Sequence, residues 1–178
     1  MCFFIVSEVL ARIFHISTDA PKTVKNERGF IDYVANQEGY WEGGKHKWYI
    51  NKYGYPGKDE KLPSSFKNLI TVIGDSYIEN FMNPDSCRQA IFLKKIKADY
   101  NYFEMSRSGA NLLDYLEYTK VMDTCKPIYN LLYVNTNDFK QSIRNLNSNV
   151  LSTQIDLVTE KMFYPKYQGS KLKDVLYN

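Results

Sequence analysis

The stretch LITVIGDSYIEN, from Leu69 to Asn80, decides how the rest of the chain is interpreted. Its first five residues are aliphatic or β-branched and have the length of a buried strand. The run stops at Gly74, and Asp75 and Ser76 follow before a polar segment begins. Glycine and aspartate at this point are typical of a turn. The same arrangement places Ser76 at the carboxyl end of a strand, where open α/β sheets bind their ligands.

The composition is that of a globular chain with a mild positive charge. The 178 residues suit one domain, and 44% hydrophobic with 24% charged residues excludes a disordered chain. Lys and Arg number 23 against 20 Asp and Glu, and this net charge of +3 is too small to indicate nucleic-acid binding. Three cysteines without metal-ligand or redox spacing predict no metal site and no disulfide framework. The compartment therefore stays open between the cell envelope and the cytoplasm.

Two parts of the chain differ in pattern. Residues 1–66 form a lead-in segment with an apolar start and a stretch rich in Gly, Pro and aromatic residues, and residues 67–178 carry an α/β pattern. Residues 1–14 are too short for a membrane-spanning helix, which needs about 20 apolar residues. We expect them to form a short amphipathic helix that packs on the domain. The alternative is the remnant of a membrane anchor whose beginning is missing, through which the protein would associate with a membrane.

Strand and helix patterns alternate from residue 68 onward. Apolar runs of strand length occupy 69–73, 101–105 and 128–134, and apolar residues at helical spacing mark 86–98 and 111–123. One further helix is predicted over 148–163. Strands that alternate with helices predict an α/β fold, a three-layer α/β/α sandwich of flavodoxin-like type with a parallel central sheet.

A polar cluster follows each of the three predicted strands, at 74–76, 106–111 and 135–138. Because the carboxyl ends of parallel strands meet at one edge, these clusters should converge. Acyl transfer needs a hydroxyl nucleophile and donors for the developing oxyanion. Ser76 can supply the hydroxyl, and the N–H groups of Ser76 and Gly109 with the side-chain amide of Asn137 can supply three donors. Glycine allows close approach of the backbone, and asparagine donates without charge.

These clusters resemble the sequence blocks of the SGNH, or GDSL-type, hydrolase superfamily. VIGDSY is similar to its first block, SRSGAN to its second, and YVNTNDF to its third, so the likeness covers about residues 68–139. The third block departs from the usual Gly-x-Asn-Asp, because Asn135 stands in place of the glycine. The resemblance implies a three-layer α/β/α fold and a serine esterase or acyl transferase that acts on an ester-linked acyl group of a small molecule or carbohydrate.

The resemblance also implies roles for five residues. Ser76 would be the nucleophile, Gly109 and Asn137 would belong to the oxyanion hole, and Asp75 and Asp138 would support the site. No metal and no organic cofactor is implied. In the family, relatives with an N-terminal membrane anchor often act on cell-surface carbohydrates.

The general base is not evident in the sequence. The family supplies a histidine near the C-terminal end of its domain, three residues after an aspartate, whereas His15 and His46 both precede Ser76. We expect the chain to be a fragment that is incomplete at its C-terminus, with the base beyond residue 178. His46 is the candidate substitute base, and His15 is a weaker one.

Two other classes of function stay open. A chain that keeps the scaffold and the polar edge without a base would be a catalytically inactive binding module. A flavodoxin-like phosphate or nucleotide binder is the third class, although the chain has no glycine-rich phosphate loop.

Overall fold

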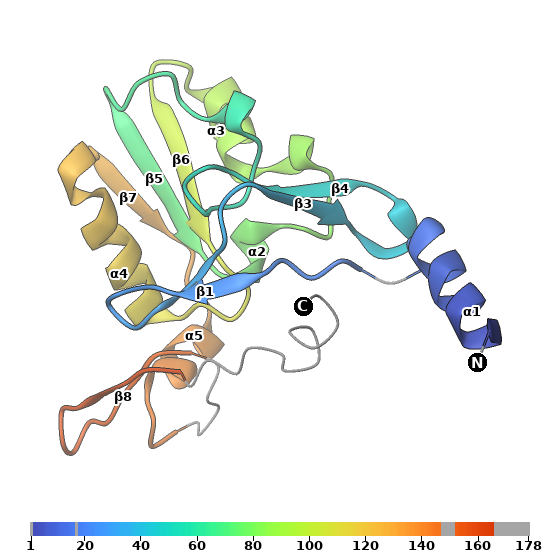
Figure 1. Cartoon of the computed structure of the whole chain (residues 1–178). Helices are drawn as coiled ribbons and strands as arrows, with labels where there is room; N and C mark the ends of the chain where they lie inside the picture. The colour runs from blue at the N-terminus through green and yellow to red at the C-terminus, as the bar shows by residue number, and fades with distance from the viewer. Residues whose placement is uncertain (1, 17, 147–151, 166–178) are drawn as a thin grey trace.

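The centre of the fold is a parallel sheet of three strands, seen in a computed structural model that describes residues 2–16, 18–146 and 152–165 (Figure 1). Its strands are β5 (Leu69–Gly74), β6 (Asn101–Ser106) and β7 (Tyr129–Leu132), and they lie in the order β6-β5-β7. β5 is therefore the central strand, and all of its residues are buried. The mixed α/β class with a parallel sheet, predicted from the sequence, is confirmed.

Helices flank both faces of this sheet. Helix α3 (Gln89–Ile96) connects β5 to β6 and α4 (Leu112–Met122) connects β6 to β7, and they lie on opposite sides of the sheet (Figure 1). Successive side chains of β5 point to opposite faces. One face joins the larger apolar cluster under α4, formed by Tyr55, Leu69, Ile73, Phe103, Met105, Ala110, Tyr115, Tyr118 and Met122. The other face joins the cluster under α3, formed by Ile70, Val72, Ile78 and Tyr102.

Two short helices begin directly after strands of the sheet, and four single 3₁₀ turns complete the helical structure of the described residues. The short helices are α2 (Ser76–Glu79), after β5, and α5 (Thr136–Ser142), after β7. The 3₁₀ turns are η1 (Glu42–Gly44), η2 (Asp59–Lys61), η3 (Asp85–Cys87) and η4 (Asp123–Cys125). η3 occupies the start of the helix predicted over 86–98, which leaves α3 shorter than expected. Both α2 and α5 start at the edge of the sheet where the polar clusters were predicted.

The lead-in segment packs on the domain through two antiparallel hairpins. They are formed by β1 (Thr23–Lys25) with β2 (Ile31–Tyr33), and by β3 (Gln37–Tyr40) with β4 (Lys47–Ile50). Tyr33, Trp48 and Ile50 form a buried cluster with Phe81, which follows α2. These contacts tie the hairpins to the loop that leaves α2, at the same end of the sheet as the predicted site.

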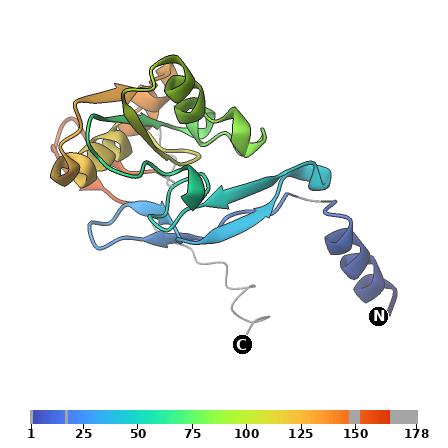
Figure 2. The ribbon, with the colours of Figure 1, turned by 90° about the horizontal axis from the view of Figure 1, so that it is seen from above.

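Helix α1 (Cys2–Ile13) does not show the packing predicted for it. It extends away from the rest of the molecule (Figure 2), and its large apolar side chains are exposed from Ile5 to Ile13. The chain is held instead just after the helix, where His15 stacks on Tyr40 and its carbonyl accepts from the N–H of Gly43. No helix within 2–16, 18–146 and 152–165 is long and apolar enough to cross a membrane.

The helix predicted over 148–163 is wrong for the described part of that range, and residues 148–151 lie outside it. Residues 152–165 contain the short strands β8 (Gln154–Ile155) and β9 (Met162–Phe163), paired antiparallel. Asp156 explains the difference, because its carboxylate accepts from the backbone N–H groups of Val158 and Thr159 at 2.9 and 3.0 Å. Such local side-chain bonds close a turn and compete with helix formation.

Candidate active site

The carboxyl ends of the three parallel strands surround one open pocket. It has a volume of about 480 Å³, within the range of small-molecule sites. It is lined by Asp75, Ser76, Tyr77, Gly109, Asn135, Thr136, Asn137, Asp138 and Gln141. The structure therefore brings together five of the residues singled out from the sequence, and they come from the loops after β5, β6 and β7.

Ser76 stands at the first position of α2 with its hydroxyl group free. A Cβ on Gly74 would collide with Ile78, so the glycine lets α2 fold back onto the end of β5. Asp75 caps the helix, since its Oδ1 accepts from the N–H of Tyr77 at 2.9 Å. The capping role that serine often plays is thus filled by its neighbour. Within the described residues, neither the hydroxyl nor the N–H of Ser76 has a hydrogen-bond partner.

A turn conformation, and not a lack of space for a side chain, favours glycine at position 109. The N–H of Ala110 donates to the carbonyl of Arg107 at 2.9 Å, and Gly109 at the third position of this turn has a φ of +75°. That conformation is typical of a type II turn and favours glycine. A Cβ at this position would meet no protein atom within 4 Å. The conformation of the turn is a reason for glycine in addition to the predicted close approach to a substrate, and the Gly109 N–H has no partner in the described chain.

Asn135 connects the residues at the floor of the pocket by hydrogen bonds. In the sequence it stood out only as a departure from the pattern of the third block. It caps α5, with its Oδ1 accepting from the N–H groups of Asn137 and Asp138 at 2.7 and 3.3 Å. Its Nδ2 donates to Asp75 and to Asp138, at 2.9 Å each. One amide therefore joins the two carboxylates and fixes the loop after β7 to the turn after β5.

Asp138 is buried and fully bonded. Its Oδ2 accepts from the N–H of Asn135 at 2.9 Å and from the hydroxyl of Tyr115 at 3.0 Å. Burial raises the pKa of Tyr115, and the neighbouring Asp138 raises it further, so this hydroxyl stays protonated and donates. Burial likewise raises the pKa of Asp75, against the lowering effect of the N–H of Tyr77. Both carboxylates therefore hydrogen-bond to the loops that surround the pocket.

The side chain of Asn137 is exposed at the pocket. Its backbone N–H is held by Asn135, but its exposed side chain has no hydrogen-bond partner among the described residues. The helix start thus fixes the backbone of Asn137 and leaves its amide group without a partner in the described chain.

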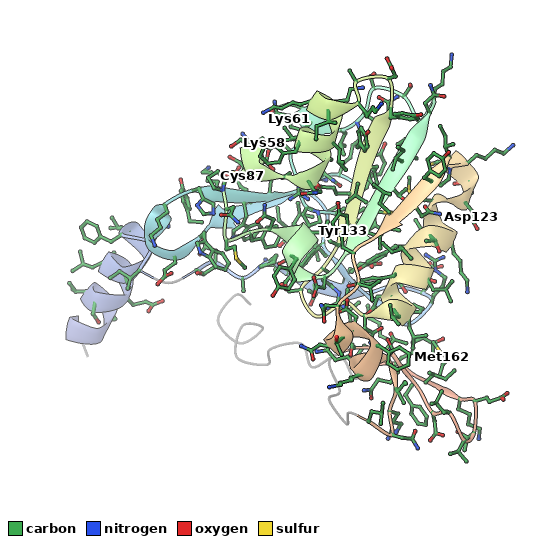
Figure 3. All side chains as sticks on the ribbon, turned by 180° about the vertical axis from the view of Figure 1, so that it is seen from behind. Lys58, Lys61, Cys87, Asp123, Tyr133 and Met162 are labelled. Carbon is green, nitrogen blue, oxygen red and sulfur yellow. The ribbon has the colours of Figure 1, made fainter. Side chains whose placement is uncertain are left out.

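Tyr133, two residues before Asn135, lies beside the turn at Gly74 and connects the end of β7 to β5 through its N–H (Figure 3).

Neither histidine lines the pocket. The Nε2 of His46 lies 2.8 Å from the carbonyl oxygen of Phe81, and because a carbonyl only accepts, that nitrogen carries the proton. His15 stacks on Tyr40 with ring centroids 3.8 Å apart. Of the described residues that line the pocket, only Asp75 and Asp138 carry a titratable carboxylate. The described residues also contain no group of three or more His, Cys, Asp and Glu that could hold a metal ion.

Two signals in the sequence could have revealed more of this site. Both Asn111 and Asn135 begin an Asn-x-x-Asp pattern, and both form a capping box with the aspartate three residues later. Asn111 also donates to the carbonyl of Thr153 at 2.8 Å, which connects α4 to the last described segment. Comparisons with protein-family models, with curated proteins and with solved structures give no match for this chain, so the pocket itself carries the functional argument.

Proposed function

We propose that this protein is a serine esterase or acyl transferase that acts on an ester-linked acyl group. The observation that carries the proposal is the arrangement at the pocket, where Ser76, Gly109 and Asn137 come from three strand ends. Their candidate reacting groups have no partners within the described chain, whereas the polar groups beneath them are bonded to one another. The resemblance of the three sequence blocks to SGNH hydrolases supports the same chemistry.

The proposed reaction has two steps. The Oγ of Ser76 attacks the ester carbonyl and loses its proton to a base, and the carbonyl oxygen becomes an oxyanion. The N–H groups of Ser76 and Gly109 and the amide of Asn137 stabilise that charge, each donor contributing on the order of 10²–10³ in rate. The alcohol leaves with the proton from the base, and the acyl group on Ser76 then passes to water or to another hydroxyl group.

No histidine is among the described residues that line the pocket around Ser76. Asp75 and Asp138 already accept hydrogen bonds on both of their oxygens, which disfavours a role in taking the Ser76 proton. His46 remains the candidate substitute base, and it would have to leave the carbonyl of Phe81 to reach the pocket. Replacement of His46 by Gln tests this directly, since Gln retains a donor for Phe81 but takes up no proton.

The lining of the pocket supports a small acyl group on a hydroxyl-rich alcohol. Apart from Tyr77, its side chains are small or polar, so the described lining offers no apolar groove for a long acyl chain. Tyr77 is 77% exposed at the start of α2, where its ring can stack on a sugar. An acylated carbohydrate is the substrate class that we propose.

The test is covalent labelling of the full chain with a fluorophosphonate, followed by mass spectrometry of the modified peptide. We expect the probe on Ser76, no label on Ser76→Ala, and normal labelling of Ser86→Ala, a control at an exposed serine. Hydrolysis of p-nitrophenyl acetate should follow the same order. If the wild-type chain neither reacts with the probe nor hydrolyses the ester, the enzymatic proposal is wrong.

The second candidate is a binding module without catalysis. It is favoured by the hydrogen bonds of Asp75, Asn135, Asp138 and Tyr115, which are complete without any catalytic group. Such a pocket would bind an acetylated monosaccharide equally well before and after Ser76→Ala, with no turnover by the wild-type protein. Isothermal titration combined with product analysis separates the two candidates.

A further inference from the structure

Glu79 is a buried acid next to the proposed nucleophile that the proposed reaction does not use. It is the last residue of α2, three positions after Ser76, and its side chain is only 4% exposed. It does not line the pocket. A buried carboxylate without hydrogen bonds would be strongly destabilising, so its partners show what it does.

Two of these partners belong to the loop that carries Gly109. The Oε1 of Glu79 accepts from the backbone N–H of Ser108 at 2.6 Å, and its Oε2 accepts from the Ser108 hydroxyl at 2.5 Å. The third donor is the hydroxyl of Tyr33 in β2. Burial and the charge of Glu79 raise the pKa of Tyr33, so this hydroxyl stays protonated and donates. Glu79 therefore joins three segments: α2, the lead-in hairpin and the loop after β6.

The other side of Ser108 is held by a buried arginine. The Nη1 of Arg107 donates to the carbonyl of Ser108 at 2.9 Å, and Arg107 is 6% exposed. That carbonyl and the N–H of Gly109 belong to one trans peptide unit, in which they point in opposite directions. Holding the carbonyl on Arg107 thus turns the Gly109 N–H away from the guanidinium group.

We propose that Glu79 is a positioning residue that fixes the Ser108–Gly109 peptide relative to Ser76. Glu79 and Ser76 share one helical turn, so a carboxylate bonded to Ser108 sets the spacing between the nucleophile and the Gly109 donor. Its catalytic consequence rests on the proposed function, whereas its effect on the Gly109 backbone does not. A carboxylate suits this site because its two oxygens accept from all three groups, the Ser108 N–H, the Ser108 hydroxyl and the Tyr33 hydroxyl.

The test compares Glu79→Gln with a matched control, Glu117→Gln. Glutamine is uncharged and has one acceptor oxygen and a donor amide, so the bond to the Ser108 hydroxyl must either reverse its direction or be lost. Glu117, in α4, is similarly buried and pairs with Arg28 at 2.6 Å, and within the described residues no hydrogen bond or ion pair joins it to the Ser108 loop. The amide NMR signals of Gly109 and Ser76 report the geometry in the full chain, and kcat and KM for p-nitrophenyl acetate report its consequence.

We expect Glu79→Gln to shift the Gly109 amide signal and to lower kcat by about tenfold or more with KM nearly unchanged. Glu117→Gln should leave the Gly109 signal and kcat as they are in the wild type. Ser108→Ala removes only the bond to Oε2, and it should give a smaller change in the same direction. This variant also decides the matter if Glu79→Gln does not fold.

Two results would overturn the inference: an unchanged Gly109 amide in both Glu79→Gln and Ser108→Ala, or an equal shift in Glu117→Gln. A lack of esterase activity in the wild-type chain would instead contradict the proposed function. In that case the amide signals still decide whether Glu79 positions the Gly109 peptide.

Discussion

The side-chain amide of Asn135 donates a hydrogen bond to the carboxylate of Asp75 at 2.9 Å, and this bond joins the ends of two neighbouring parallel strands. The same nitrogen donates to Asp138 at 2.9 Å. Without this donor, two carboxylates would face each other at the floor of the pocket, and the charge of Asp138 already contributes to the raised pKa of Asp75. Asn135 thus stabilises the site both as a helix cap and as a bridge.

Replacing Asn135 with alanine should therefore destabilise the fold. Loss of an N-cap costs about 1 kcal/mol, and loss of the donor to two buried carboxylates adds about 1–3 kcal/mol. We expect the free energy of unfolding, measured by urea denaturation, to fall by about 2–4 kcal/mol in total. Asn145→Ala, at an exposed asparagine, is the control and should leave stability unchanged. An equal stability of Asn135→Ala and wild type would contradict the bridging role.

Asn137 should behave in the opposite way. Its side chain is exposed and unbonded within the described chain, so alanine should change the free energy of unfolding by less than about 0.5 kcal/mol. If Asn137 donates to the oxyanion, kcat should fall by about 10²–10³. Ester hydrolysis by Asn137→Ala and by Asn145→Ala, at an exposed asparagine outside the pocket, measures the difference. Comparable activity in both variants would remove Asn137 from the oxyanion hole.

Gly109 permits a separation of backbone strain from function. Its φ of +75° makes an alanine side chain unfavourable by about 1–2 kcal/mol, although the space for a Cβ is open. Gly43 has a φ of +67° and similarly open surroundings, but it lies in η1, outside the pocket. Gly109→Ala and Gly43→Ala should therefore lose similar stability in thermal denaturation. Only Gly109→Ala should also lose esterase activity. An equal loss of esterase activity in both variants would argue against a role for the Gly109 N–H.

The sequence was informative where local pattern decides structure. The apolar run at 69–73 and the predicted strand at 101–105 match β5 and β6 almost residue for residue, since the buried strands of a parallel sheet are apolar runs of strand length. The meeting of the polar clusters then follows from parallel topology alone. The start of α4 was also predictable, because Asn111 caps it as its residue type suggests.

The rest depends on contacts between distant segments. In the sequence, Glu79 looks like an ordinary acidic residue of a helix. Only the structure shows that Tyr33 and Ser108 donate hydrogen bonds to it. The bridging role of Asn135 likewise requires knowing that Asp75 lies across the strand ends. The packing of α1 was mispredicted for a related reason: an apolar helix pattern does not show which surface covers it, and in the structure the large apolar side chains from Ile5 to Ile13 are exposed.

Asp114 is a buried acid in the second capping box, and it gives a prediction on pH. Its Oδ2 accepts from the N–H of Asn111 at 3.0 Å, and Arg107 lies 3.6 Å away. Burial raises the pKa of Asp114 to about 6, while Arg107 opposes the shift and Asp32 and Glu117 add to it. The folded protein therefore holds this proton more tightly than the unfolded chain, whose aspartates titrate near 3.9.

The sign of the effect follows from this difference. The stabilising contribution of protonated Asp114 is fully present below about pH 4 and is lost as the pH rises through about 6. Relative to Asp114→Asn, the wild-type free energy of unfolding should fall by about 2 kcal/mol between pH 4 and pH 7. Asp156, whose pKa is lowered by the N–H groups of Thr159 and Val158, should show the opposite trend at lower pH: its stabilisation relative to Asp156→Asn is present above about pH 4 and is lost as the pH falls below it. Urea denaturation of the three proteins at intervals of one pH unit measures both trends. A difference between wild type and Asp114→Asn that stays constant with pH would mean that Asp114 titrates as an ordinary aspartate, and that the positive charge of Arg107 fully offsets its burial.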